Sequence, residues 1–157
     1  FYEVDGRHPL VRYQGGGAAM PTTADNLVLH SYAMDARDVA DQFAPAMRAN
    51  LERLGLARDD ARDRVVRFYL HQANRFFVDG FAREAGIPAE KAPINIDRYG
   101  NTSAASTLIL LDEDRHGGRV GEGDRITFLW VGAGRMRGGT LITLGSCGLR
   151  PFVTHIT

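Results

Sequence analysis

The apolar run at residues 65–70, Val-Val-Arg-Phe-Tyr-Leu, ends directly at the polar quartet His-Gln-Ala-Asn of residues 71–74. Its β-branched, aromatic and aliphatic side chains predict a buried strand. Apolar residues at about 74–85 then recur at helical spacing, which predicts a helix that Gly86 ends. A buried strand that leads into a helix predicts a layered α/β fold, and it places His71 at the end of a strand.

Helical and strand-like patterns continue to alternate along the rest of the chain. Apolar residues between Val39 and Leu54 recur every three or four positions, so a helix is expected there, with Asp35 as its N-cap and Pro45 inside it. The remaining expected elements are a short strand at residues 94–96, a helix over about 103–116, and strands at 125–131 and 139–144.

The composition excludes several classes of partner. The chain has 157 residues, which suits one domain with a sizeable core, and its 19 basic residues balance its 19 acidic ones. This balance removes the case for attraction to nucleic acid or to a membrane surface through net charge. No apolar run approaches the ~20 residues that span a bilayer. Cys147 is the single cysteine, so an internal disulfide is excluded and a reducing cytoplasm is the expected compartment.

Three separated segments offer hydrogen-bond donors. His71 follows the first strand, and Asn101 lies in a second polar motif at residues 100–106, Gly-Asn-Thr-Ser-Ala-Ala-Ser. Residues 132–134, Gly-Ala-Gly, follow a later strand and offer backbone N–H groups. An imidazole, a carboxamide and backbone N–H groups are the donors that stabilise a developing oxyanion. The sequence shows no zinc-like ligand spacing, so no metal is expected in this site.

Each donor also has a purely structural interpretation. An isolated histidine at a strand end is typical of a core, Gly-Asn-Thr-Ser around Asn101 is good helix-capping sequence, and a Gly-x-Gly segment is common in turns. Cys147 lies beyond the last expected strand, whereas a nucleophilic thiol is expected at a helix start or beside a base. The nucleophile that such a donor site would serve is therefore expected elsewhere.

Taken together, residues 71–74, the segment 97–106 and the glycine-rich turn at Gly132 resemble the carboxyl-terminal half of a β-ketoacyl-acyl carrier protein synthase III. This family belongs to the thiolase-fold condensing enzymes, and the resemblance covers about residues 5–144. It implies an α/β fold, namely the carboxyl-terminal half of a thiolase-like layered sandwich, with a mixed sheet and covering helices. The implied divisions are a connecting segment from a missing amino-terminal half at 1–33, a thiolase-like domain at 34–144, and a tail of unknown role at 145–157.

The resemblance also implies a reaction. A cysteine in the amino-terminal half takes an acyl group from a coenzyme A or acyl carrier protein thioester. A malonyl thioester then loses carbon dioxide and attacks the acyl-enzyme. His71 and Asn101 are implied to stabilise the enolate, and the Ala133 N–H is implied to be the oxyanion-hole donor for the acyl-cysteine. The resemblance further implies a homodimer that needs no cofactor, with a substrate tunnel that includes Met34, Arg37, Asn74 and Phe77.

Two other functions stay open at this point. One is a relative that moves an acyl group to an alcohol or amine without condensation, and Asn101 argues against it because acyl shuttling needs no enolate donor. The other is a non-catalytic partner subunit of a condensing enzyme. The presence of a cysteine at a strand-to-helix turn in the upstream polypeptide would distinguish these functions from the condensing enzyme.

Overall fold

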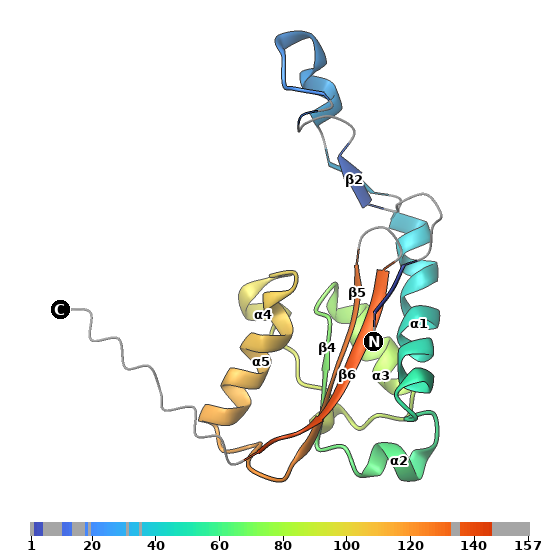
Figure 1. Cartoon of the computed structure of the whole chain (residues 1–157), viewed down its shortest axis with the longest axis vertical. Coiled ribbons are helices and arrows are strands. Elements are labelled where there is room, and N and C mark those ends of the chain that lie inside the picture. The colour runs from blue at the N-terminus through green and yellow to red at the C-terminus, as the bar shows by residue number, and fades with distance from the viewer. Residues whose placement is uncertain are drawn as a thin grey trace, which may run out of the picture.

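The computed structural model describes residues 2–4, 11–13, 18, 20–30, 32–34, 36–132 and 136–145. Its body is one mixed sheet with helices on both faces (Figure 1). Strands β4 and β5 run parallel, whereas β6 runs antiparallel to β5, and β1 antiparallel to β6. The strands follow the spatial order β1 (Tyr2–Val4), β6 (Met136–Thr143), β5 (Arg125–Gly132) and β4 (Arg67–Leu70).

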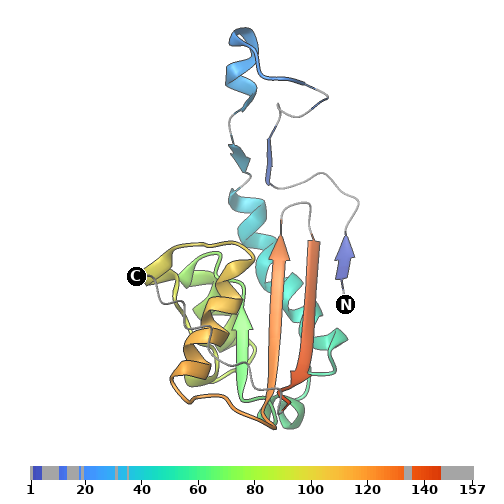
Figure 2. The same ribbon diagram turned by 60° about the vertical axis from the view of Figure 1, so that its left-hand side comes forward.

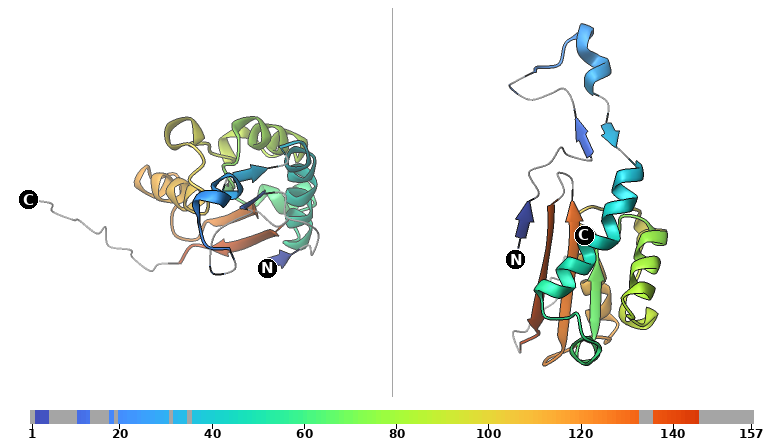
Figure 3. Two further views of the ribbon diagram at one scale, coloured as in Figure 1. Left: turned by 90° about the horizontal axis from the view of Figure 1, so that it is seen from above. Right: turned by 90° about the vertical axis from the view of Figure 1, so that its right-hand side faces the viewer.

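Helices α1 (Ala36–Arg53) and α3 (Arg75–Glu84) cover one face of this sheet, and α5 (Ala105–His116) covers the other (Figures 1 and 3). Within the described residues, no helix has the length and apolar composition needed to cross a membrane. The short helical segments are α2 (Asp59–Asp63), the 3-10 turn η2 (Ala89–Lys91) and α4 (Ile96–Tyr99).

The two faces of the sheet carry separate cores, as the twofold repeat of a strand requires. Phe68 and Leu70 of β4, with Leu129 of β5, pack in the core under α1 and α3. Tyr69 and Ile126 belong to the second core, which includes Leu110 of α5. Side chains that alternate along β4 therefore hold a helical layer on each side.

A buried carboxylate attaches α5 to the sheet. Asp114 is 4% exposed, and its Oδ2 accepts hydrogen bonds from Arg67 Nε and the Tyr69 hydroxyl, each at 3.0 Å. Its Oδ1 accepts from Arg119 Nε at 2.5 Å. Burial and the charge of Asp114 raise the pKa of Tyr69, so this hydroxyl remains a donor.

A small two-stranded sheet lies apart from the main one. Strands β2 (Val11–Tyr13) and β3 (Tyr32–Met34) pair antiparallel, and the 3-10 helix η1 (Ala24–His30) lies between them in the sequence. They extend beyond the amino-terminal end of α1 (Figure 2). The segment expected to be a connection thus also supplies β1 to the main sheet.

Most expected elements are confirmed, including the long helix with Pro45 inside it and the strand that precedes His71. The predicted strand at residues 94–96 is wrong, because Ile96 begins α4 instead. The Asn95 N–H donates to the side chain of Gln72 at 3.2 Å rather than to a neighbouring strand. The predicted N-cap Asp35 lies outside the described residues.

Candidate active site

His71 lies directly beyond the carboxyl end of β4. Its N–H donates to the Leu129 carbonyl at 2.9 Å, so the parallel ladder continues through this residue, and its carbonyl accepts from the Ala73 N–H at 3.0 Å. The side chain is partly buried, and this burial lowers the pKa of the imidazole. The ring is therefore neutral at pH 7, which is the form that donates through one nitrogen while the other remains unprotonated.

Asn101 lies in a turn before α5 that fixes the orientation of its carboxamide. Oδ1 accepts a hydrogen bond from the Ser103 N–H at 2.9 Å, and Ser103 has a left-handed φ of 55°. This side-chain turn settles which end of the amide faces the backbone. Asn101 is exposed, and its Nδ2 makes no hydrogen bond to a described residue, so the NH₂ group is available as a donor. The residue that precedes α5 is Ala104, so Asn101 supports the turn rather than the first position of the helix.

The third predicted donor, the Ala133 N–H, lies outside the described residues, as does Cys147. The strand that leads to Ala133 is described, and it ends at Gly132. In the parallel pair, Leu70 is the partner of Leu129. The carboxyl ends of β4 and β5 therefore meet at one edge of the sheet, where His71 and Gly132 follow them.

The predicted tunnel residues lie in three places. Asn74 is the N-cap of α3, and its Oδ1 accepts from the backbone N–H two residues later at 2.8 Å. Phe77 is partly buried against the core, with its ring centroid 5.4 Å from that of Phe43. Met34 is 52% exposed at the end of β3, and Arg37 is exposed in the first turn of α1. Their role in a tunnel stays a prediction.

Two of the three residues with buried carboxamides in the described part of the chain bond to one another, and neither was singled out from the sequence. Gln72 is fully buried, and its side chain bonds both to the end of β4 and to the segment before α4. Asn95, at that segment, is 1% exposed. The available signal was the position of Gln72, a polar residue inside the motif that directly follows a buried strand.

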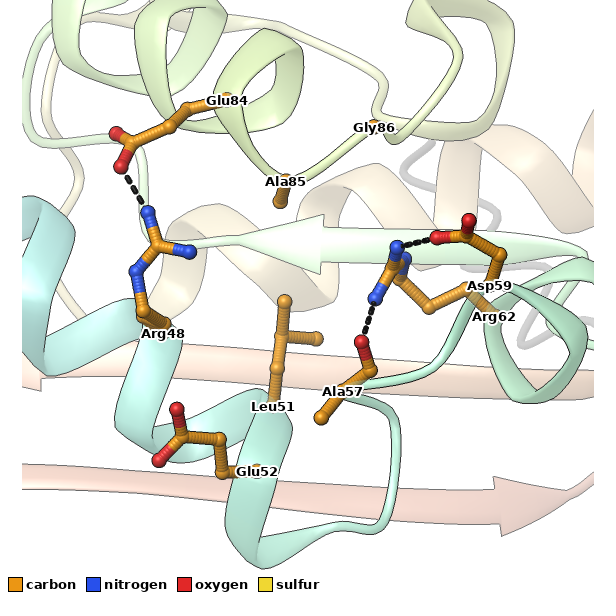
Figure 4. Close-up of a pocket in the computed structure, with 9 residues that line it drawn as sticks. All are labelled: Arg48, Leu51, Glu52, Ala57, Asp59, Arg62, Glu84, Ala85 and Gly86. Carbon is orange, nitrogen blue, oxygen red and sulfur yellow. Dashed lines mark hydrogen bonds and ion pairs between the residues drawn. The ribbon is translucent and has the colours of Figure 1, made fainter.

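A pocket lies away from these residues, among α1, α2 and the carboxyl end of α3 (Figure 4). Arg48 pairs there with Glu84, and Arg62 with Asp59. Helix α2 precedes β4, so this pocket lies at the amino end of that strand, whereas His71 follows the carboxyl end (Figure 1). In the part of the chain that the structure describes, no three His, Cys, Asp or Glu side chains gather as a metal site.

The sequence of this chain is similar to that of a known family. Residues 51–144 match the family described as 3-oxoacyl-[acyl-carrier-protein (ACP)] synthase III C terminal. A β-ketoacyl-[acyl-carrier-protein] synthase III from Rhizorhabdus wittichii is 35% identical over 131 residues, which are 83% of this chain and 40% of that protein. The enzyme of the same name from Rhizobium meliloti is 34% identical over 142 residues, 88% of this chain and 41% of the relative.

Solved structures give the same result. A 3-oxoacyl-(acyl-carrier-protein) synthase III superposes with a TM-score of 0.82 at 25% identity, over 92% of this chain and 46% of its own. The synthase III from Thermus thermophilus superposes with a TM-score of 0.73 at 27% identity, over 92% of this chain and 45% of its own. The fold is therefore that of the thiolase-like condensing enzymes.

Within that class, the chain belongs to the 3-oxoacyl-acyl carrier protein synthase III family, in the region that forms the carboxyl-terminal part of its members. It spans about two fifths of the length of the curated relatives that it matches.

The lowered pKa of His71 predicts a specific dependence of stability on pH. Above the ordinary histidine pKa of about 6.5, the ring is neutral in both the folded and the unfolded state. As the pH falls below that value, the unfolded state takes up a proton before folded His71 does, so the free energy of unfolding decreases until the pH passes the lower, folded pKa.

In the complete protein, His71→Gln should therefore lose less stability than the wild type between about pH 6.5 and the lower folded pKa. Chemical denaturation at a series of pH values measures this. His116→Gln, which also removes one histidine of this chain, is the comparison variant for the loss of an imidazole as such. Parallel curves for wild type and His71→Gln would contradict the assignment of a partly buried, neutral His71.

Proposed function

We propose that the complete protein is an acyltransferase that carries out a decarboxylative Claisen condensation. A cysteine thiolate in the amino-terminal half attacks an acyl thioester, and the acyl group transfers to sulfur as the carrier thiol leaves. A malonyl thioester then loses carbon dioxide, and the electron pair of the broken C–C bond forms an enolate. The enolate carbon attacks the acyl-cysteine carbonyl and the C–S bond breaks, which yields a β-ketoacyl thioester and regenerates the thiolate.

His71 and Asn101 are the residues of this chain that stabilise the enolate oxygen in the proposed reaction. The observation that carries the proposal is the hydrogen bond from the Ser103 N–H to Asn101 Oδ1, because it holds the NH₂ end of the carboxamide free to donate. Neutral His71 adds a second donor that is fixed by the parallel ladder. Donors that are oriented before charge develops lower the barrier because they need no reorganisation during the reaction.

The amino-terminal half is also a structural partner in this proposal. Residues 108–111 of α5, Leu-Ile-Leu-Leu, are apolar around the helix, yet only Leu110 is buried, and Leu108 is 60% exposed. Exposed apolar side chains at such a turn are typical of a contact surface. The relatives that match this chain are more than twice as long. We therefore assign the uncovered side of α5 to contact with the amino-terminal half.

Residues 1–157 expressed alone should be unstable or aggregate, because the exposed side of α5 would remain in contact with water. Size exclusion and circular dichroism, compared with the complete protein, measure this. The variant Leu108→Gln should improve the solubility of the isolated chain, since it replaces the exposed apolar side chain. A soluble wild-type monomer with a cooperative thermal transition would contradict the proposed contact.

The condensation proposal predicts half-reactions that can be separated. In the complete protein, Asn101→Asp keeps an oxygen that accepts from the Ser103 N–H but removes the NH₂ donor. Carbon dioxide release from the malonyl thioester should fall about 100-fold or more, as is typical when one oxyanion donor is lost. Acyl loading from a thioester should stay close to wild type, because the cysteine and the Ala133 N–H remain. Radiolabel capture on the enzyme and release of labelled carbon dioxide measure the two steps.

Two control variants accompany the half-reaction test. Asn101→Ala removes the donor without adding a charge and should show the same separation of the two steps. Glu122→Gln changes an exposed carboxylate in the turn before β5 and should leave both steps unchanged. Unchanged decarboxylation in both Asn101 variants would favour acyl transfer to an alcohol or amine. A wild-type protein that does neither step would favour a non-catalytic partner subunit.

The remaining features of the proposal follow from the reaction. The substrates are thioesters of coenzyme A or an acyl carrier protein, and the step needs no cofactor. Met34, Arg37, Asn74 and Phe77 are proposed to line the path of the carrier arm. A cytoplasmic homodimer remains the expected state of the complete protein, consistent with the single cysteine in this chain.

A further inference from the structure

Gln72 directly follows His71 in the sequence, and its carboxamide is fully buried. Its Nε2 donates to the Leu70 carbonyl at 2.9 Å, and its Oε1 accepts from the Asn95 N–H at 3.2 Å. Burying a primary amide is costly unless its polar atoms find partners, so this position is tightly specified. Glutamine fits because one planar group both donates and accepts.

The first of these bonds encloses His71. Leu70 precedes His71 and Gln72 follows it, so the bond from Gln72 Nε2 to the Leu70 carbonyl closes a ring around the backbone of the histidine. The His71 N–H is already held by Leu129, and its carbonyl by the Ala73 N–H. The Gln72 side chain thus adds a fixed point beside the backbone of His71 where β4 ends.

The second bond leads to Asn101. Asn95 Nδ2 reaches the Ser106 carbonyl, although at a long 3.5 Å, and the Ser106 hydroxyl donates to the Ser103 carbonyl at 2.7 Å. Ser103 in turn donates its N–H to Asn101 Oδ1. The Asn95 segment is thus tied to the end of β4 by the bond to Gln72 and, through the longer contact to Ser106, to the turn that holds Asn101.

We propose that Gln72 is a positioning residue that sets the separation of His71 and Asn101, a role that rests on the condensation proposed above. Gln72 itself need not touch substrate. Its carboxamide joins the backbone that carries the imidazole to the segment that leads into the Asn101 turn. Two donors that converge on one oxygen must be held to within about half an ångström, and misplacement by about 1 Å can cost roughly 100-fold in rate.

The test uses Gln72→Met in the complete protein, because methionine has a similar volume but no hydrogen-bonding amide. Carbon dioxide release should fall about 10- to 100-fold while acyl loading stays close to wild type. In the Asn101→Asp background, the same change should have a much smaller effect, since residues that act through one network are not additive. Equal losses of acyl loading and carbon dioxide release would show that Gln72 contributes only to the stability of the fold. Fully additive effects of Gln72→Met and Asn101→Asp would show the same.

Asp114→Asn is the matched control, because it also perturbs a buried hydrogen-bonding side chain but belongs to the network of Arg67 and Tyr69. It should lower the melting temperature without changing the ratio of the two half-reactions. If Asn101→Asp leaves carbon dioxide release unchanged, the proposed function fails, and this inference with it. If Asn101→Asp has its full effect and Gln72→Met has none, only the positioning role fails.

Gln72→Glu is a second variant that covers the case in which Gln72→Met does not fold. A glutamate retains the acceptor for the Asn95 N–H, and burial raises its pKa, so its protonated form can donate to the Leu70 carbonyl. Carbon dioxide release relative to wild type, measured at each pH, should recover as the pH falls. A pH-independent ratio would contradict the requirement for a donor at this position.

Discussion

The parallel pairing of β4 with β5 is the constraint on which the rest of the structure depends. Leu70 opposite Leu129 brings the carboxyl ends of both strands to one edge of the sheet, and the ladder continues into the His71 N–H. Side chains that alternate along β4 anchor α1 and α3 on one face and α5 on the other. The same strand therefore organises both cores and delivers a donor to the edge where the candidate site lies.

Local patterns were enough to predict the elements that carry this arrangement. The β-branched and aromatic run before His71 indicates β4. The spacing of Phe43, Met47 and Leu51 indicates α1, and these three residues lie on its buried side. The prediction failed at residues 94–96, because Ile94 and Ile96 flank a backbone N–H whose partner lies 23 residues earlier in the chain. A side-chain partner at that distance leaves no periodic signal.

The chemistry of the site residues could be predicted from the sequence, whereas their surroundings could not. The residue types of His71 and Asn101 indicate donor chemistry from the sequence alone. Their protonation and orientation depend on surroundings, namely the burial of the imidazole and the Ser103 N–H that holds the amide oxygen. The position of Gln72 could not be predicted, because it depends on two backbone partners that only the folded chain brings together. The exposed side of α5 likewise could not be predicted, because only the folded structure shows that Leu110 is buried whereas Leu108 is exposed.

The central claim is that the His71 ring and the Asn101 amide converge on one substrate oxygen. A crystal structure of the complete protein, bound to a malonyl thioester analogue that cannot lose carbon dioxide, tests this most directly. We predict that one ring nitrogen of His71 and Nδ2 of Asn101 each lie at about 3 Å from the same thioester oxygen. A structure in which the two groups face different sides of the sheet, or in which only one of them reaches that oxygen, would contradict it.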